Sequence, residues 1–274
     1  MIPDFTDTAL SQLWSLDGRV AVVTGGGSGM GQATALRLAE AGATTVVADI
    51  APDKAQETAD LISKRTPGSQ TVPFTVDVAD PASVRALGDA TVELFGHIDV
   101  WVNTAWLSSS GSIADYSDEM WRQGIGVNLD GSFYTAREAA QRMLAAGRRG
   151  VIILVTSGSA HHGRARRYQY VAAKHGTLGL VRSLALELGP AGIRVVAIAP
   201  AATDTPGYRA APVRFSGADA EQAKRLLDDT IAKMALGRLA RADDIARGAV
   251  FAASDMAGFI TGSTIHVDGG VDAS

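Results

Sequence analysis

Cysteine is absent from the 274 residues of this chain. Its absence excludes disulfide bonds, thiolate catalysis and zinc sites that use cysteine ligands. A chain without cysteine fits a reducing compartment, so we expect a cytoplasmic protein.

The sequence also lacks the features of membrane, exported and nucleic-acid-binding proteins. No stretch approaches the roughly 18 uninterrupted apolar residues of a membrane-spanning helix. The N-terminal residues carry acidic side chains where a signal peptide carries positive charge, and no apolar segment follows them. A net charge of −4 with 20% charged residues does not favour an anionic partner. We therefore expect neither a nucleic acid nor a membrane as a partner.

Short apolar runs rich in β-branched residues alternate with longer stretches of helical period. The predicted strands are residues 20–24, 44–49, 71–76, 99–103, 151–156, 193–199 and 264–267. The predicted helices are residues 29–41, 52–64, 81–95, 118–146, 170–188 and 242–254. Strands without polar alternation are typical of a sheet buried on both faces. The alternation therefore predicts an α/β fold, with a parallel sheet between two helical layers.

The length and pattern suit one domain. We predict a single domain over residues 17–274, preceded by an N-terminal extension, residues 1–16. Residues 205–220 form the longest poorly patterned stretch after a strand. Long loops at the carboxyl ends of strands are often functional, so we predict a lid-like segment over residues 205–235.

A glycine-rich turn, Thr24–Gly31 (TGGGSGMG), follows the first predicted strand directly. Its Gly25, Gly29 and Gly31 have the spacing G-x-x-x-G-x-G, not the more common G-x-G-x-x-G. Glycines at this position let backbone N–H groups approach a pyrophosphate at the start of the next helix. A purely structural turn is the alternative, but the position between strand and helix favours a nucleotide site.

An acidic residue, Asp49, ends the second predicted strand. A carboxylate there can accept hydrogen bonds from both adenosine ribose hydroxyls and would repel a 2′-phosphate. The glycine turn contains no Arg or Lys, and Ile50 follows the acid. We therefore expect NAD to be preferred over NADP, the alternative being that Asp49 caps the helix at Pro52. Asp77 could bind the adenine amino group, or belong to the turn before Pro81.

Further motifs make the chain resemble the single-domain short-chain dehydrogenases/reductases over roughly residues 17–271. Tyr170 and Lys174 match the family's Y-x-x-x-K, and the glycine turn matches its T-G-x-x-x-G-x-G. The family's catalytic Ser and Asn match Ser157, 13 residues before the tyrosine, and Asn128 in GVNLDGSF.

The family's closing motif and its threonine after the sixth strand are also present, at residues 267–270 and Thr205. The resemblance implies a Rossmann-like doubly wound sheet of about seven strands in the order 3-2-1-4-5-6-7. It also implies NAD(H)-dependent interconversion of a secondary alcohol and a ketone. Helices 118–146 and 170–188 are similar to interface helices of the family, which implies a homotetramer or homodimer. The other implied cofactor contacts are Ser28, Met30, Val78, Asn103, Ala105, Tyr170, Lys174, Pro200 and Thr203.

Four positions depart from the family pattern. The family's N-N-A-G reads N-T-A-W and ends at Trp106; the other departures are Ala160, Val196 and Ala201. None of these removes a catalytic group. Trp106 puts an indole where the family has no side chain, which leaves cofactor placement and pocket shape open.

The four matched residues suit alcohol oxidation, in which the hydroxyl proton leaves as the hydride departs. Tyr170 as general base needs a pKa below its usual value of about 10. Lys174 lies on the same helix face, and a charge about 4 Å away lowers a pKa by about three units. Ser157 can donate to the developing alkoxide, and the resemblance implies that Asn128 holds a water linking Lys174 to solvent. Two glycines shortly before Asn128 weaken its helix and would ease a distortion there.

The catalytic tyrosine and serine each have a neighbour of the same type. Tyr168 lies two residues before Tyr170, about 200° around a helix, and Ala172 stands where its lysine would be. Ser159 competes with Ser157 for the role of hydrogen-bond donor to the substrate, but the family's spacing of 13 residues before the tyrosine favours Ser157.

The residues between Ser159 and the catalytic tyrosine include two histidines and three arginines. His161 and His162 are adjacent, which does not suit a shared metal, so we expect no metal and place them on the loop over the substrate. Arg164, Arg166 and Arg167 form either a solvated loop or an anchor for an anionic substrate group. The predicted substrate-pocket residues are Trp106, Ser159, His162, Arg164, Ala201 and Tyr208.

Two other functions use the same fold. Eliminating relatives of the halohydrin type lack the nucleotide turn and carry Arg in place of the lysine, so the glycine turn and Lys174 argue against them. An NAD-sensing regulator needs only the cofactor half, so the presence of all four catalytic residues argues against a non-enzyme.

Overall fold

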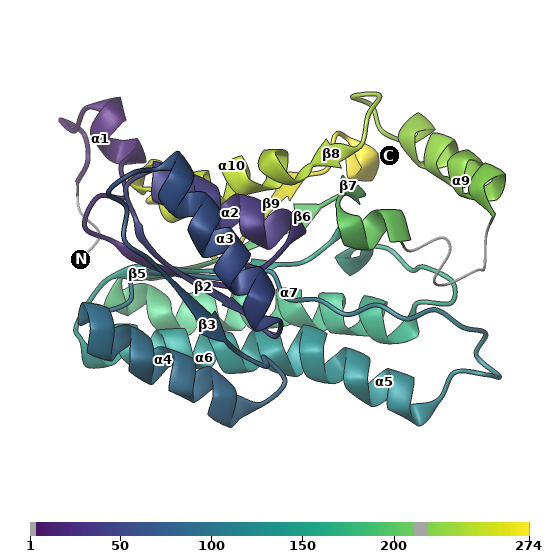
Figure 1. Cartoon of the computed structure of the whole chain (residues 1–274), viewed down its shortest axis with the longest axis horizontal. Coiled ribbons are helices and arrows are strands. Elements are labelled where there is room, and N and C mark those ends of the chain that lie inside the picture. Colours follow the sequence, from purple (N-terminus) through teal and green to yellow (C-terminus); the bar gives the residue numbers. More distant parts are fainter. Residues whose placement is uncertain (1–3, 211–218, 274) are drawn as a thin grey trace.

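Seven parallel strands form the central sheet, in the order β3-β2-β1-β4-β5-β6-β9 (Figure 1). The computed structural model describes residues 4–210 and 219–273. The strands are β1 (Val20–Thr24), β2 (Thr44–Asp49), β3 (Thr71–Thr75), β4 (Val100–Asn103), β5 (Gly150–Val155), β6 (Ile193–Pro200) and β9 (Thr264–Val267). The predicted doubly wound order is confirmed, with β9 as the seventh strand.

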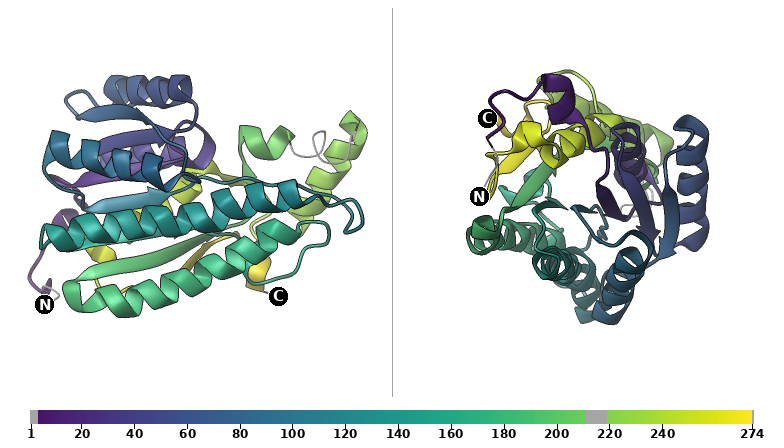
Figure 2. Two further views of the ribbon diagram at one scale, coloured as in Figure 1. Left: turned by 90° about the horizontal axis from the view of Figure 1, so that it is seen from below. Right: turned by 90° about the vertical axis from the view of Figure 1, so that its left-hand side faces the viewer.

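Helices cover both faces of the sheet, as the end-on view in Figure 2 shows. One face packs against α4 (Pro81–Phe95), α6 (Gly131–Ala145) and α7 (Tyr168–Leu188). The other face packs against α2 (Gly29–Glu40), α3 (Pro52–Arg65) and α10 (Ala242–Ala253). Three further helices are α1 (Leu10–Trp14), α5 (Asp118–Ile125) and α9 (Ala220–Ala232).

Each central strand contributes to two hydrophobic cores. In β1, Val22 packs into the core on the α4, α6 and α7 side, whereas Ala21 and Val23 pack into the core on the α2, α3 and α10 side. Successive side chains of a strand point to opposite faces, so both sets must be apolar. This explains why the strands read as uninterrupted apolar runs in the sequence.

The predicted helix over residues 118–146 is interrupted. It consists of α5, a π-helical turn (Gly126–Asp130) and α6. Within the turn, Asn128 Nδ2 donates 2.8 Å to the carbonyl of Gly124. The predicted distortion at Asn128 is therefore present. Helix α7 begins at Tyr168, two residues earlier than predicted.

The residues on either side of the predicted lid-like segment, 205–235, pair with each other. Strand β7 (Thr203–Asp204) pairs in parallel with β8 (Ala240–Arg241), which forms a small second sheet. Helix α9 belongs to this segment and projects at the right of Figure 1. Residues 211–218, which the lid prediction also includes, lie outside the described residues.

The N-terminal segment packs on the domain through Leu16, whose side chain is fully buried in the α2, α3 and α10 core. Helix α1 precedes it. At least one residue of the predicted N-terminal extension, Leu16, thus belongs to the core of the domain.

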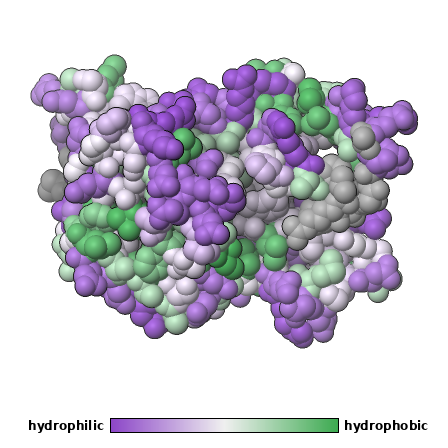
Figure 3. All heavy atoms as spheres, in the orientation of Figure 1, coloured by the Kyte–Doolittle hydropathy of each residue, from purple (hydrophilic) through white to green (hydrophobic). Residues whose placement is uncertain are grey.

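Hydrophilic residues cover most of the face in Figure 3, with apolar patches between them. Within residues 4–210 and 219–273, no helix is long and apolar enough to cross a membrane.

Candidate active site

Two adjoining cavities lie at the edge of the sheet where the parallel strands end. One has a volume of about 400 Å³ and the other of about 350 Å³. They share the lining residues Met30, Thr104, Trp106 and Thr205. In open α/β sheets, ligands bind outside the carboxyl ends of the strands. We call these the nucleotide cavity and the catalytic cavity.

The nucleotide cavity collects most of the residues predicted to hold the cofactor. Those that line it are Gly25, Ser28, Gly29, Met30, Gly31, Asp49, Ile50, Asp77, Val78, Ala105 and Thr205. Asn103 lies below it, buried, where its Oδ1 accepts 2.8 Å from the hydroxyl of Thr24. Pro200, Thr203, Tyr170 and Lys174 line the catalytic cavity instead.

The glycine turn packs too closely against neighbouring backbone to hold side chains. Gly25 has a positive φ of 74°, and a Cβ there would lie 2.7 Å from the backbone nitrogen of Ala105. A Cβ on Gly31 would collide with the carbonyl of Gly25. Helix α2 starts at Gly29, and Ser28 makes no side-chain cap to it. The turn lines the nucleotide cavity, and with the uncapped helix start it fits the pyrophosphate of a dinucleotide.

The two acidic residues of this cavity are held by backbone donors. Asp49 Oδ2 accepts 2.9 Å from Gly27 N, and its Oδ1 accepts 3.0 Å from Ala51 N, just before α3. Asp77 Oδ1 accepts 2.9 Å from Ala79 N, which closes a turn. Both carboxylates therefore have a structural role while they line the cavity, so the local and the ligand-binding interpretations are compatible.

Lys174 is the most buried of the predicted catalytic residues in the catalytic cavity, with 2% of its surface exposed. Its Nζ donates 2.8 Å to the carbonyl of Val155 and lies 5.6 Å from the centre of the Tyr170 ring. Burial lowers the pKa of Lys174 to about 8 because a buried ammonium loses its hydration.

Tyr170 shows the opposite shift from the one expected. Burial around its hydroxyl raises its pKa, while a hydrogen bond with Ser157 and the charges of Arg167 and Arg164 act to lower it. The expectation that the charge of Lys174 alone lowers the pKa of Tyr170 below its usual value is therefore wrong. The spacing correctly predicted that Lys174 lies near Tyr170, but spacing does not report how much hydration the tyrosine hydroxyl loses on burial.

Ser157 and Ser159 have different partners. Ser157 Oγ accepts 3.1 Å from Ser159 N and also bonds with Tyr170. The hydroxyl of Ser159 accepts 2.8 Å from Arg164 Nε. The geometry therefore places Ser157, as predicted from the spacing, next to the tyrosine.

Tyr168 points elsewhere. Its ring packs edge-on against Tyr116, with ring centres 5.2 Å apart. Unlike Tyr170, it does not line the catalytic cavity. The helical geometry that argued against Tyr168 thus agrees with its position.

Asn128 is fully buried and lies below the catalytic cavity. Its Nδ2 donates to the carbonyls of Leu107 and Gly124, at 2.6 and 2.8 Å, and lies 3.4 Å from Gln169 Oε1. Gln169 is itself buried, and a Cβ on Gly124 would collide with it. Sequence reasoning missed Gln169, because no residue near it in the sequence marks it as buried.

Five of the six predicted substrate-pocket residues line the catalytic cavity, and His162 does not. Trp106, Ser159, Arg164, Ala201 and Tyr208 line the catalytic cavity.

His162 and His161 do not line it. The indole of Trp106, 41% exposed, lies between the two cavities and approaches Gly207, where a Cβ would be 3.0 Å from it. Trp106 lines both cavities, so its indole affects the shape of the site where the two cavities adjoin.

His162 instead faces the C-terminal segment, with its Nε2 3.4 Å from Asp272 Oδ1. The structure also brings together a group the sequence did not suggest, in which one ligand atom each of His266, Asp268 and Asp272 lies within 4.8 Å of the others. His266 Nδ1 lies 3.9 and 3.8 Å from the two carboxylates, so a protonated histidine forms ion pairs with both.

Comparison with known proteins agrees with this geometry. Residues 25–272 match the family model described as enoyl-(acyl carrier protein) reductase. A short-chain dehydrogenase/reductase of Aspergillus oryzae, astE, is 38% identical over 96% of this chain and 98% of its own length. The chain belongs to the short-chain dehydrogenase/reductase family. It is an oxidoreductase, with alcohol dehydrogenases among its relatives, and the family binds nicotinamide cofactors.

Two further relatives differ in the cofactor named. The L-rhamnose 1-dehydrogenase (NAD(P)(+)) of Azotobacter vinelandii is 36% identical over 92% of this chain and 96% of its own. A solved structure from Agrobacterium tumefaciens, named for 2-deoxy-d-gluconate 3-dehydrogenase activity, contains NADP. It is 35% identical with a TM-score of 0.83, over 95% of this chain and 99% of that one.

The buried lysine makes a prediction about stability. Its pKa is about 8 in the folded state against 10.5 in the unfolded chain, so protonated Lys174 costs stability below pH 8 and the cost disappears as the pH rises toward 10.5. Lys174→Met should raise the free energy of unfolding at pH 7 by up to about 3 kcal/mol, less the lost bond to Val155. Urea unfolding at pH 7, 9 and 10 measures it. Exposed Lys64→Met is the control; equal effects of both variants, or a gain that grows with pH, would contradict the prediction.

Proposed function

We propose that this member of the family is an NAD(H)-dependent oxidoreductase that interconverts a secondary alcohol and a ketone. One observation carries the proposal: Ser157, Tyr170 and Lys174 line a cavity that shares four residues with the nucleotide cavity. When bound, the nicotinamide accepts or gives the hydride. A substrate carbon in the catalytic cavity would thus lie beside it.

The chain's own residues handle the proton and the oxygen. The Tyr170 hydroxyl takes the substrate proton in oxidation and returns it in reduction. Ser157 donates a hydrogen bond to the same substrate oxygen as negative charge develops on it. Lys174 holds a positive charge near the tyrosine, and Asn128 with Gln169 keeps the π-helical turn in place behind it.

Tyr170→Phe should reduce turnover by about a hundredfold to ten-thousandfold, because it removes the acid–base group. NADH binding should change little, since the phenyl ring keeps its packing. Initial rates followed by NADH absorbance give the turnover, and fluorescence titration with NADH gives the affinity. Tyr168→Phe is the matched control and should keep full activity; loss of turnover in the control but not in Tyr170→Phe would reverse the assignment.

The preference for NAD is supported by Asp49. Its carboxylate lines the nucleotide cavity, and both of its oxygens are fixed by backbone donors. A fixed negative charge at this position repels a 2′-phosphate, and the ribose hydroxyls of NAD can donate to it. The nearby cation Lys54, on α3, forms an ion pair with Glu57 at 2.7 Å, so its charge is already paired.

Asp49→Ser should shift the ratio of kcat/KM for NADP over NAD upward by at least about tenfold, which corresponds to 1.4 kcal/mol. The change removes repulsion of the 2′-phosphate and an acceptor for the ribose. Asp53→Ser, which alters an exposed acid four residues later, should leave the ratio unchanged. An unchanged ratio in Asp49→Ser would rule out Asp49 as the selecting residue.

The catalytic cavity favours a substrate that carries an anionic group, such as a carboxylate. Arg164 and Arg167 both line it, whereas Arg166 does not. Arg164 Nε is held 2.8 Å from Ser159, and Arg167 Nη1 is held 3.0 Å from Ser108. These bonds hold the guanidinium groups in the cavity, where their charges act on Tyr170.

Arg164→Gln should therefore raise KM about tenfold for a hydroxy acid while changing KM little for its neutral amide or ester. Initial rates with NAD on such matched pairs measure the difference. Arg166→Gln is the control for loss of one charge on the same loop. The anion interpretation fails if KM rises equally for the charged and the neutral substrate.

We also propose a homo-oligomer, a tetramer or a dimer, that works in the cytoplasm. Exposed apolar side chains on the predicted interface helices support it: Phe133 and Leu144 on α6, and Leu186, 82% exposed, on α7. The lack of cysteine supports the reducing compartment.

A further inference from the structure

A third cavity lies at the opposite edge of the sheet from the active site. Its volume is about 740 Å³, larger than the nucleotide or the catalytic cavity. Its walls include the residues at which strands begin: Arg19 precedes β1, Asp99 precedes β4, and Gly150 and Ile193 begin β5 and β6. Because the strands are parallel, this amino edge is separated from both other cavities by the length of the sheet.

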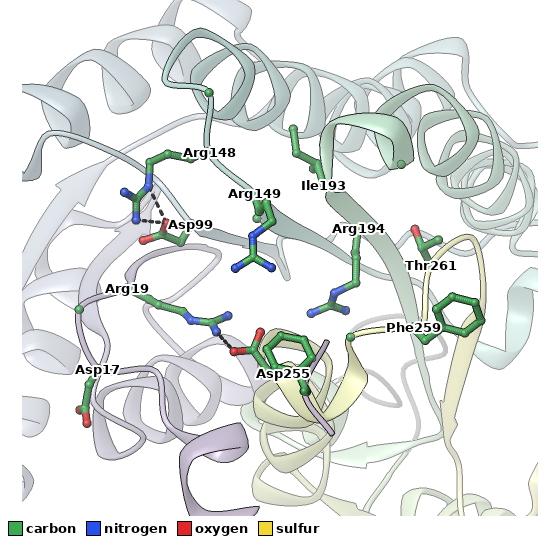
Figure 4. Close-up of a pocket in the computed structure, with 17 residues that line it drawn as sticks. Asp17, Arg19, Asp99, Arg148, Arg149, Ile193, Arg194, Asp255, Phe259 and Thr261 are labelled. Carbon is green, nitrogen blue, oxygen red and sulfur yellow. Dashed lines mark hydrogen bonds and ion pairs between the residues drawn. The ribbon is translucent and has the colours of Figure 1, made fainter. Parts of the chain in front are cut away.

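Four arginines line this cavity, and two of them have a carboxylate partner. Arg148 contacts Asp99 through Nε and Nη2, at 3.0 and 2.8 Å. Arg19 Nη2 contacts Asp255 at 2.5 Å. Figure 4 shows both pairs, with Asp17 turned to the side of the cavity.

Arg194 has no carboxylate partner among the described residues. Its guanidinium donates to the carbonyls of Ala252, Ser254 and Ile260, at 2.7, 3.2 and 3.4 Å. Burial first, and then the like charge of Arg19, lower its pKa to about 10, while the charge of Asp255 acts to raise it. The guanidinium is therefore still charged at neutral pH. The carbonyls orient this cation but do not neutralise it.

Arg149 has no hydrogen bond or ion pair with any residue in the described part of the chain. Its side chain lies over Gly192, where a Cβ would be 2.8 Å from Arg149 Cγ. In Figure 4 its guanidinium points to the middle of the cavity, toward those of Arg19 and Arg194. The missing side chain at Gly192 thus leaves room for the Arg149 side chain, which remains exposed.

We propose that this amino-edge cavity binds a phosphorylated small molecule. Three guanidinium groups come from different segments and approach one space from different sides, which suits the tetrahedral oxygens of phosphate better than a flat carboxylate. The volume exceeds that of phosphate alone and lies in the range of small-molecule sites. Phe5 and Phe259 in the walls offer apolar surface to the organic part.

The experiment is calorimetric titration of the full-length protein, saturated with NADH so that the nucleotide cavity is filled. The probes are inorganic phosphate, phenyl phosphate and benzoate at low ionic strength. We expect phenyl phosphate to bind more tightly than phosphate, and benzoate more weakly than either. Benzoate binding as tightly as phenyl phosphate would overturn the choice of phosphate.

Arg149→Gln should weaken binding of phenyl phosphate at least about tenfold, since it removes a charge-assisted donor. Its turnover should equal that of the unchanged enzyme, because Arg149 lies at the other edge of the sheet. Arg85→Gln, an exposed arginine on α4, is the matched control and should bind normally. Arg164→Gln tests the catalytic cavity as the alternative location of the anion.

Three further results would overturn the proposal. They are no binding of either phosphate, binding that Arg149→Gln does not weaken, and binding lost in Arg164→Gln but kept in Arg149→Gln. The last would place the anion in the catalytic cavity. None of these results bears on hydride transfer, which Tyr170→Phe tests separately.

Discussion

The hydrogen bond from Lys174 Nζ to the carbonyl of Val155 joins the two parts of the chain that carry the proposed reaction centre. Val155 ends β5, and Ser157 follows two residues later; Lys174 lies on α7 one turn after Tyr170. A bond between strand end and helix therefore sets the distance between serine and tyrosine. Because Lys174 is buried, the contact restricts how α7 can shift along the sheet.

The parallel sheet separates two kinds of electrostatic environment. At the carboxyl edge, acidic Asp49 and the uncapped start of α2 suit a dinucleotide with free ribose hydroxyls and a pyrophosphate. At the amino edge, the C-terminal carbonyls of α10 attract Arg19 and Arg194. Arginine is favoured there by the negative end of the helix dipole, and the same side chains then create a positive cavity. The stability of the fold thus accounts for two of the arginines, and Arg149 is the one it does not require.

Much of the fold could be predicted from the sequence because each strand is buried on both faces. Such strands read as apolar runs, and the predicted limits of β1 and β2 agree with the structure to the residue. The residues around Tyr170 could be assigned because the family's Y-x-x-x-K fits Tyr170 and Lys174, and helical spacing separates Tyr170 from Tyr168. The distortion at Asn128 could be expected because two glycines before it weaken the helix.

Other features depend on contacts between distant segments and left no local pattern. Gln169 supports Asn128 from 41 positions away, and nothing in its neighbours marks it as buried. The amino-edge arginines are spread from Arg19 to Arg194 and meet only because parallel strands begin at one edge. The direction of the Tyr170 pKa shift likewise depends on how completely the hydroxyl is enclosed, which no spacing reports.

The two shifts in the catalytic cavity have a joint consequence. Burial raises the pKa of Tyr170 and lowers that of Lys174 to about 8, so as the pH rises the lysine loses its proton before the tyrosine does. These two shifts therefore favour neutral Lys174 beside neutral Tyr170 over a tyrosinate–ammonium pair. A positive charge held in the neighbouring nucleotide cavity would stabilise the tyrosinate, because enclosed charges interact strongly. Proton abstraction by Tyr170 would then depend on occupancy of the nucleotide cavity. Tyr170 would stay protonated until the cofactor is bound there.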